Sequence, residues 1–319
     1  MNVIISGSIS NSFQLIGAIA AKNKFSDSLN TAVYLKISYH QYWNKKNISR
    51  EVLEIIENDF PIIKETEPLR TIHLSINNPR ILKKNQIIID DGVAAYRKNP
   101  FALLKAINNE RKIKNSPPFS IKESIEYILI QSLKMLYSTI HPGHISIFKK
   151  TIFDYFEPSE ENKKHFLKAI AQISNRLNEE YFKENKKIIL FLSQPYKLFG
   201  FKKPKDYENF IKRVIIHFKK ENPNAIFVIK KHPIDDFDYL GVEAQISTDN
   251  NLPAEIYFYR NKENIIQTIG FNSTSLLTGK ILFDIPGFYI ERRDSPSITG
   301  DFWVDRGFKK HLSPLRLSC

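Results

Sequence analysis

Two carboxylates and a glycine, Asp90-Asp91-Gly92, directly follow the apolar run Ile87 to Ile89. Three β-branched residues in a row predict a short buried strand, and Gly92 predicts a sharp turn after it. Adjacent Asp side chains repel each other, which raises the pKa of one of them. A carboxylate held in this way at a strand end can take a proton from an alcohol. The same tripeptide is also typical of a solvated turn that caps the next helix.

A second apolar run, Ala225 to Ile229, is followed by Lys230, Lys231, His232 and Pro233. A histidine at such a strand end can neutralise developing negative charge or donate a proton, and the lysines add positive potential. Alternate side chains of a strand point to opposite faces, so only one of the two lysines is expected to face the same side as the site. A strand-end histidine satisfied by backbone groups is the alternative interpretation.

A third strand-like run, Asn264 to Ile269, is followed by Gly270, Phe271 and a polar cluster. The cluster consists of Asn272, Ser273, Thr274 and Ser275. Hydroxyl and free N–H groups at the start of a helix suit a phosphate. An ordinary helix N-cap has the same local sequence, so the cluster alone does not decide between the two.

In this order, an acidic pair with Gly, a strand that ends in Lys-His-Pro, and a Ser/Thr cluster resemble the bacterial sialyltransferases. The similarity is to the capsule polysialyltransferases and lipooligosaccharide sialyltransferases, glycosyltransferase families 38 and 52. The elements span Asp90 to Ser275. The resemblance implies an inverting transferase that moves sialic acid from CMP-sialic acid to a hydroxyl of a capsule or lipooligosaccharide glycan. It implies no cofactor, with the CMP-sugar and an anionic glycan or glycolipid acceptor as partners.

The resemblance also assigns the catalytic roles. The second acidic position carries the general base in these families, so Asp91 is the predicted base, and Asp90 positions it or the loop. Adjacent carboxylates titrate as a coupled pair, so the choice between Asp90 and Asp91 stays open. His232 is predicted to face the CMP phosphate and to stabilise or protonate the leaving group, with Gly92 as a structural turn.

Nucleotide binding is predicted at three strand ends and one helix. Glu255 resembles the acidic residue that contacts the CMP ribose in related enzymes, and Ser193-Gln194-Pro195 lies at a strand end near the same site. The predicted nucleotide-binding residues are Lys231, Pro233, Gln194, Pro195, Glu255, Asn272, Ser273, Thr274 and Ser275. Family 52 enzymes carry an Asp in the loop that is here 193–196, without a carboxylate, which makes the capsule-type families the nearer analogy.

A metal ion is not expected. Asp236-Phe-Asp238 has the Asp-x-Asp spacing of metal-dependent transferases, but it follows His-Pro directly in a polar stretch. A CMP donor carries one phosphate rather than a pyrophosphate, so a divalent ion has less charge to neutralise. We therefore expect Asp235 to Asp238 to form a solvated loop.

The elements that position these residues alternate between strand and helix. The first unit begins with a strand at Asn2–Ser6, a loop at Gly7–Ser12 and a helix at Phe13–Lys22, with Ser12 as the expected N-cap. Strands at 31–37 and 70–74 and a helix at 49–59 follow. Such alternation predicts a parallel sheet with helices on both faces and ligands beyond the carboxyl ends of the strands.

A second αβ pattern begins after two predicted helices, 100–114 and 121–138, the second with an apolar stripe. The pattern contains strands at 188–192, 225–229, 264–269 and 281–283 and a helix at 205–220. The predicted fold is α/β and GT-B-like, with two Rossmann-like domains that face a central cleft. Its predicted parts are an N-terminal acceptor-side domain (1–156), a hinge helix region (157–187) and a C-terminal CMP-sugar-binding domain (188–319).

Composition limits the remaining possibilities. The net charge of +13 favours anionic partners, but no run of five basic residues marks a nucleic-acid binder. The single cysteine, Cys319, excludes an internal disulfide, and the first residues lack a secretory n-region. We expect a cytoplasmic protein or one on the cytoplasmic face of the membrane. The alternatives are a transferase that uses another CMP-activated acid such as CMP-Kdo, or a basic, non-enzymatic membrane-surface binding protein.

Overall fold

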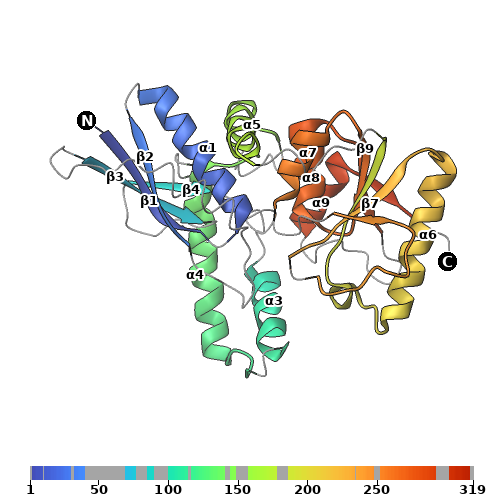
Figure 1. The fold of residues 1–319 in the computed structure, drawn as a ribbon. Coiled ribbons are helices and arrows are strands. Elements are labelled where there is room, and N and C mark those ends of the chain that lie inside the picture. Colours follow the sequence, from blue (N-terminus) through green and yellow to red (C-terminus); the bar gives the residue numbers. More distant parts are fainter. Residues whose placement is uncertain are drawn as a thin grey trace.

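The computed structural model places two parallel α/β units one after the other along the chain (Figure 1). The residues that the structure describes are 2–9, 11–29, 32–39, 69–76, 85–89, 100–113, 116–140, 144–148, 157–177, 186–233, 235–247, 252–291 and 302–316. The strands of one sheet lie between residues 2 and 145, and those of the other lie between residues 188 and 315. Two parallel α/β units in sequence confirm the predicted fold class.

The first sheet has the strand order β2-β1-β3-β4-β5, and all its pairings are parallel. Its strands are β1 (Asn2–Ile9), β2 (Val33–Tyr39), β3 (Leu69–Ile76), β4 (Gln86–Ile89) and β5 (His144–Ile145). Helix α1 (Ser12–Leu29) packs against this sheet and buries its apolar residues there. The apolar run 87–89 is fully buried in β4, which confirms the strand predicted before the acidic pair.

The second sheet has the strand order β11-β10-β9-β6-β7-β8 and is also parallel. Its strands are β6 (Ile188–Leu192), β7 (Ile226–Lys230), β8 (Gln245–Ile246), β9 (Ile265–Gly270), β10 (Gly287–Ile290) and β11 (Ser313–Leu315). Helix α6 (Pro204–Glu221) covers one face, and α7 (Ala254–Asn261) and α8 (Thr274–Phe283) cover the other. Helix α9 (Phe302–His311) precedes β11.

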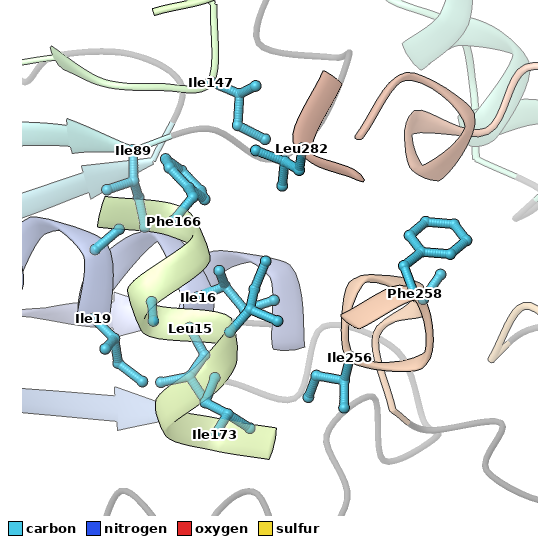
Figure 2. Close-up of a cluster of buried hydrophobic side chains, with 14 of the residues drawn as sticks. Leu15, Ile16, Ile19, Ile89, Ile147, Phe166, Ile173, Ile256, Phe258 and Leu282 are labelled. Carbon is cyan, nitrogen blue, oxygen red and sulfur yellow. The ribbon is translucent and has the colours of Figure 1, made fainter. Parts of the chain in front are cut away.

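Helix α5 (Glu160–Ser174) joins the two units (Figure 1). Ser159 caps its start by accepting a hydrogen bond from Asn162 N, and its buried face contacts α1 on one side and α7 on the other. Figure 2 shows side chains of α1, β4, α5, α7 and α8 in one apolar cluster. At the other end of α5, the Arg260 guanidinium of α7 donates hydrogen bonds to Ser174 Oγ, Ser174 O and Leu177 O. The hydrophobic core is therefore continuous across both units.

Two expectations for the first βα unit were wrong. The segment 7–9, predicted as loop, continues β1, because its residues pair with β2 as far as Tyr39. A Cβ on Gly7 would lie 2.5 Å from Leu74 Cβ, so β1 and β3 approach closely at this position. The helix cap is Asn11 rather than Ser12, since Asn11 Oδ1 accepts a hydrogen bond from Gln14 N at 2.9 Å.

The predicted strand at 281–283 was also wrong. These residues form the last turn of α8, whose buried residues recur on one side as Leu276, Leu277, Ile281 and Leu282. Short apolar runs do not distinguish a strand from a buried helix by pattern alone. The helix ends at Asp284, whose φ of 54° is left-handed, and the strand β10 follows three residues later.

The apolar stripe of the helix predicted at 121–138 is exposed on the surface. The two helices are α3 (Pro100–Ile113) and α4 (Ile121–Ile140), and they pack against each other. Of the stripe, Ile125 is 54% exposed, and Leu129 and Leu133 are each 59% exposed. No helix in the described part of the chain combines the length and apolar character that a membrane span needs. The helix predicted at 49–59 lies outside the described residues.

Candidate active site

The carboxyl edge of the second sheet has a topological switch point between β6 and β9. From β6 the chain continues to β7 and β8 on one side, and it then returns to β9, β10 and β11 on the other. In open parallel sheets, ligands bind beyond the strand ends at such a point. Ser193 follows β6, Lys231 follows β7 and Phe271 follows β9, so three predicted binding loops lie at one edge.

His232 and Pro233 begin a turn just beyond β7. The His232 carbonyl accepts a hydrogen bond from Asp235 N at 2.8 Å, and His232 N donates to Ser193 Oγ at 3.3 Å. Solvent reaches the imidazole, but the protein atoms around it still desolvate the ring. Desolvation is the main cause that lowers the pKa of His232; Asp235 opposes it and Lys230 adds to it.

A buried carboxylate lies beneath this turn. Asp235 is 5% exposed, and its Oδ2 accepts hydrogen bonds from Ser193 Oγ at 2.5 Å and from Tyr239 Oη at 2.7 Å. Its Oδ1 accepts from Phe237 N at 3.1 Å. The hydroxyl of Tyr207, on α6, lies 3.2 Å from that of Tyr239. These groups form one connected polar network on the α6 face of the sheet.

The network corrects the expectation of a solvated loop at Asp235 to Asp238. Asp236 and Asp238 are exposed, as expected, but Asp235 is not. Asp235, Phe237 and Tyr239 are buried at alternate positions of this segment. Asp235 therefore lies in the protein interior together with these two aromatic residues. The exposed carboxylates, those of Asp236 and Asp238, lie on the other face of the segment.

The two lysines that end β7 take opposite directions, as the strand period predicts. Lys230 is 5% exposed, and its charge acts on both Glu255 and His232. Lys231 Nζ donates a hydrogen bond to Phe237 O at 2.9 Å and lies 5.7 Å from the centre of the Tyr239 ring. The charge of Lys230 therefore acts on two of the predicted site residues, and nucleotide binding by Lys231 stays a prediction.

The polar cluster at 272–275 forms the start of α8. Ser273 caps the helix, because its Oγ accepts a hydrogen bond from Ser275 N at 3.3 Å. Ser275 Oγ donates to Glu255 Oε1 at 3.3 Å, and Thr278 Oγ1 donates to the same oxygen at 2.6 Å. Asn272 and Thr274 are half-buried beside them. Within the cluster, the hydroxyl of Ser275 is thus bound to a carboxylate on α7.

Glu255, the residue predicted to contact the ribose, lies on α7. The residue is 2% exposed, and burial is the main cause that raises the pKa of its carboxyl group, against the hydroxyl donors and Lys230. Its carboxylate therefore faces the protein interior and joins α7 to the start of α8. Contact with the CMP ribose stays a prediction from the resemblance alone.

The loop after β6 carries the two remaining predicted residues of this half. Gln194 and Pro195 are half-buried, and Pro195 O accepts a hydrogen bond from Leu198 N at 3.0 Å as the 3₁₀ turn η3 (Tyr196–Phe199) begins. Ser193 N donates to Lys230 O at 3.0 Å, which joins the ends of β6 and β7. Both residues lie at the correct sheet edge, and their binding role stays a prediction.

The acidic pair of the first unit lies outside the described residues. The structure describes β4 up to Ile89, so Asp90, Asp91 and Gly92 follow the end of this strand in sequence. The predicted position of Asp91 opposite His232 across a cleft stays a prediction. Among the residues that are described, no three His, Cys, Asp or Glu side chains form a group that could hold a metal ion.

The sequence interpretation missed the four residues that hold the His-Pro turn. They are Ser193, Asp235, Tyr239 and Tyr207. The available signal was the residue type of Asp235 in a turn, because an Asp side chain there often accepts a hydrogen bond from the backbone N–H two residues on, as it does from Phe237 N. The tyrosine 28 positions before Asp235 in sequence gave no such signal, because only the packing of α6 on the sheet brings it near.

Sequence comparison gives a family match for the larger part of the chain. Residues 80–292 match the model of the family described as "Alpha-2,8-polysialyltransferase (POLYST)". The match includes all three sequence elements, from Asp90 to Ser275. We found no match among curated protein sequences.

Solved structures give weaker likenesses. The GT-B domain of a sialyltransferase from Photobacterium damselae is 11% identical with a TM-score of 0.43, over 98% of this chain and 100% of that chain. The glycotransferase of kitacinnamycin is 10% identical with a TM-score of 0.45, over 98% and 85%. S. aureus MnaA with UDP is 10% identical with a TM-score of 0.42, over 92% and 80%. Values this low carry no weight for function.

Proposed function

Because this chain belongs to the alpha-2,8-polysialyltransferase family and is a sialyltransferase, we propose that it is an inverting enzyme that uses CMP-sialic acid and extends a capsule or lipooligosaccharide glycan. The observation that carries the proposal is the set of groups at the switch point of the second sheet. His232, the start of α8 and the charge of Lys230 all belong to this edge. Family membership excludes the alternative of a non-enzymatic binding protein.

The donor phosphate binds at this edge in the proposal. The first N–H groups of a helix attract anions, and the Ser273-Thr274-Ser275 segment adds hydroxyls at the start of α8. A phosphate beside His232 also changes the ring, since a nearby negative charge favours the imidazolium. Desolvation lowers the pKa of His232 in the free protein, so bound donor is what makes the ring an acid for the departing CMP phosphate.

The acceptor hydroxyl loses its proton to Asp91 in the proposal. Asp91 follows the end of β4, where ligands bind in a parallel sheet, and Asp90 orients it or the loop. Such a general base contributes about 10²- to 10⁴-fold to the rate. Attack by the acceptor on the face opposite to CMP inverts the anomeric carbon.

Charge and family support the proposed acceptor. A net charge of +13 attracts an anionic glycan or glycolipid. We propose that the enzyme lies in the cytoplasm or on the cytoplasmic face of the membrane. The single phosphate of a CMP donor has less need of a divalent ion than a pyrophosphate, so the reaction is proposed to run without metal or another cofactor.

The test combines nucleotide binding with turnover for Asp91→Ala and His232→Ala. We expect Asp91→Ala to keep the thermal stabilisation by CMP and to lose transfer by about 10²- to 10⁴-fold, and His232→Ala to weaken both. His217→Ala is the matched control, because His217 is an exposed histidine on α6. Retained turnover in Asp91→Ala would remove the base assignment, and turnover with CMP-Kdo instead of CMP-sialic acid would replace the proposed donor.

A further inference from the structure

The hydrogen bonds around Asp235 converge on its carboxylate from two sides, from Tyr207 through Tyr239 and from the backbone N–H of His232 through Ser193. Burial raises the pKa of both Tyr207 and Tyr239, so each keeps its hydroxyl proton. Tyr239 gives its proton to Asp235 Oδ2, which leaves its oxygen to accept from Tyr207. Ser193 gives its single proton to the same Oδ2 and accepts from His232 N. Each donor in this network is thus used once.

We propose that Asp235 is a positioning residue for sialyl transfer, which fixes the backbone of His232 through Ser193 and holds a negative charge beside the imidazole. The inference rests on the proposed function, in which His232 acts on the leaving CMP phosphate. Asp235 does not need to touch the donor for this role.

The backbone part of the role follows from the two ends of the turn. Asp235 N donates to His232 O at 2.8 Å, and the Asp235 side chain orients the hydroxyl that accepts from His232 N. A Ser hydroxyl without a fixed acceptor rotates freely and offers its lone pair to His232 N only part of the time. One residue therefore holds the peptide groups on both sides of His232, on the carbonyl side directly and on the N–H side through Ser193.

The charge part of the role follows from what else acts on the ring. Among the described residues, the charged groups that act on His232 are Asp235 and Lys230. Lys231 is directed to Phe237 O, and the hydroxyls of Tyr207 and Tyr239 belong to the network. Desolvation and Lys230 both lower the pKa of His232, and the charge of Asp235 opposes them and favours the imidazolium.

The test compares Asp235→Asn with Asp236→Asn. Asp236 directly follows Asp235 in the sequence, but Asp235 is buried and Asp236 is exposed. The two variants therefore change the net charge equally and differ in the position of the lost carboxylate. We expect Asp235→Asn to lower kcat with CMP-sialic acid by about 10- to 100-fold, with a smaller change in KM. The kcat of the enzyme falls as His232 loses its proton, so this fall should begin at lower pH in Asp235→Asn, and Asp236→Asn should follow the wild type.

Two results would overturn the inference. One is an Asp235→Asn profile equal to that of Asp236→Asn, and the other is a uniform loss of kcat at every pH, which a structural role alone would produce. Ser193→Ala keeps the carboxylate and removes the bridge, so it tests the backbone part if Asp235→Asn does not fold. We expect Ser193→Ala to lower kcat without a change in the pH at which kcat begins to fall. An unchanged kcat would contradict this expectation.

His232→Ala separates the two levels of the argument. If His232→Ala loses transfer while Asp235→Asn matches the wild type, the positioning role is wrong and the proposed function stands. If His232→Ala keeps full transfer, the proposed role of the histidine fails first, whatever Asp235→Asn does.

Discussion

The carboxyl edge of the second sheet carries a buried carboxylate on each of its two faces. On the α6 face, Asp235 accepts hydrogen bonds from two hydroxyls and a backbone N–H, without a lysine among those donors. On the α7 and α8 face, Glu255 accepts from two hydroxyls and is acted on by the buried charge of Lys230. Both networks are buried, but only the first ends at the backbone of a loop that carries a candidate catalytic side chain.

This difference separates two jobs that a buried carboxylate can do. Asp235 holds the geometry of a turn, so its loss should appear in the rate before it appears in stability. Glu255 joins two helices and opposes a buried cation, so its loss should appear in the free energy of unfolding. The predictions below test whether the two faces differ in this way.

The largest stability effect is expected for Glu255→Ala. The substitution removes the acceptor for Ser275 and Thr278 and a buried side chain on which the charge of Lys230 acts. We expect the free energy of unfolding, measured by urea denaturation, to fall by about 3–5 kcal/mol. Glu243→Ala removes an exposed partner of Lys219 and should cost less than about 1 kcal/mol. Equal losses in the two variants would contradict the assignment.

A smaller and graded effect is expected on the other face. Tyr239→Phe removes a donor to a carboxylate and should cost about 1.5–3 kcal/mol, whereas Tyr207→Phe removes a bond between hydroxyls and should cost about 0.5–1.5 kcal/mol. Denaturation and kcat should be measured on the same samples. The order of the two losses is the result that matters, because a reversed order would mean that Asp235 does not organise this network.

The smallest effect is expected in the pH dependence of Glu255→Gln. The pKa of Glu255 is raised above 4.5 in the folded protein, so its contribution to stability is fully present below that value and is lost as pH rises through the folded pKa. Because glutamine does not titrate, the free energy of unfolding of Glu255→Gln should not fall in this pH range. The difference between wild type and variant should therefore shrink or reverse with rising pH, and a constant difference would show that Glu255 titrates normally.

The strands were predictable from sequence where burial is complete. The run 188–192 is apolar at every position because β6 lies in the centre of its sheet, and it was predicted with its observed bounds. The run 87–89 was predicted for the same reason. The end of α8 was not predicted, because a three-residue apolar run fits either a strand or a helix. Packing against α7 stabilises the helix at this position.

The loops of the site could be predicted from the sequence, but the buried hydrogen bonds that hold these loops could not. His232 and the Ser273 cap follow strands, so the α/β pattern alone places them at the functional edge. The contacts of Asp235 with Ser193, 42 positions away, depend on the pairing of β6 with β7. Glu255 was identified by resemblance, yet its buried position depends on how α7 meets α8, which no local pattern contains.

The position of α5 has a consequence for how the molecule denatures. Its buried side chains, which include Phe166, Ile170 and Ile173, are covered partly by α1 and partly by α7, and Arg260 donates a hydrogen bond to the carbonyl of its last residue, Ser174. Neither unit can lose its structure without uncovering apolar surface of the other. Heating should thus unfold both sheets in a single cooperative transition. A chain divided near α5 would give two fragments with exposed apolar surface that aggregate, rather than two units that fold independently.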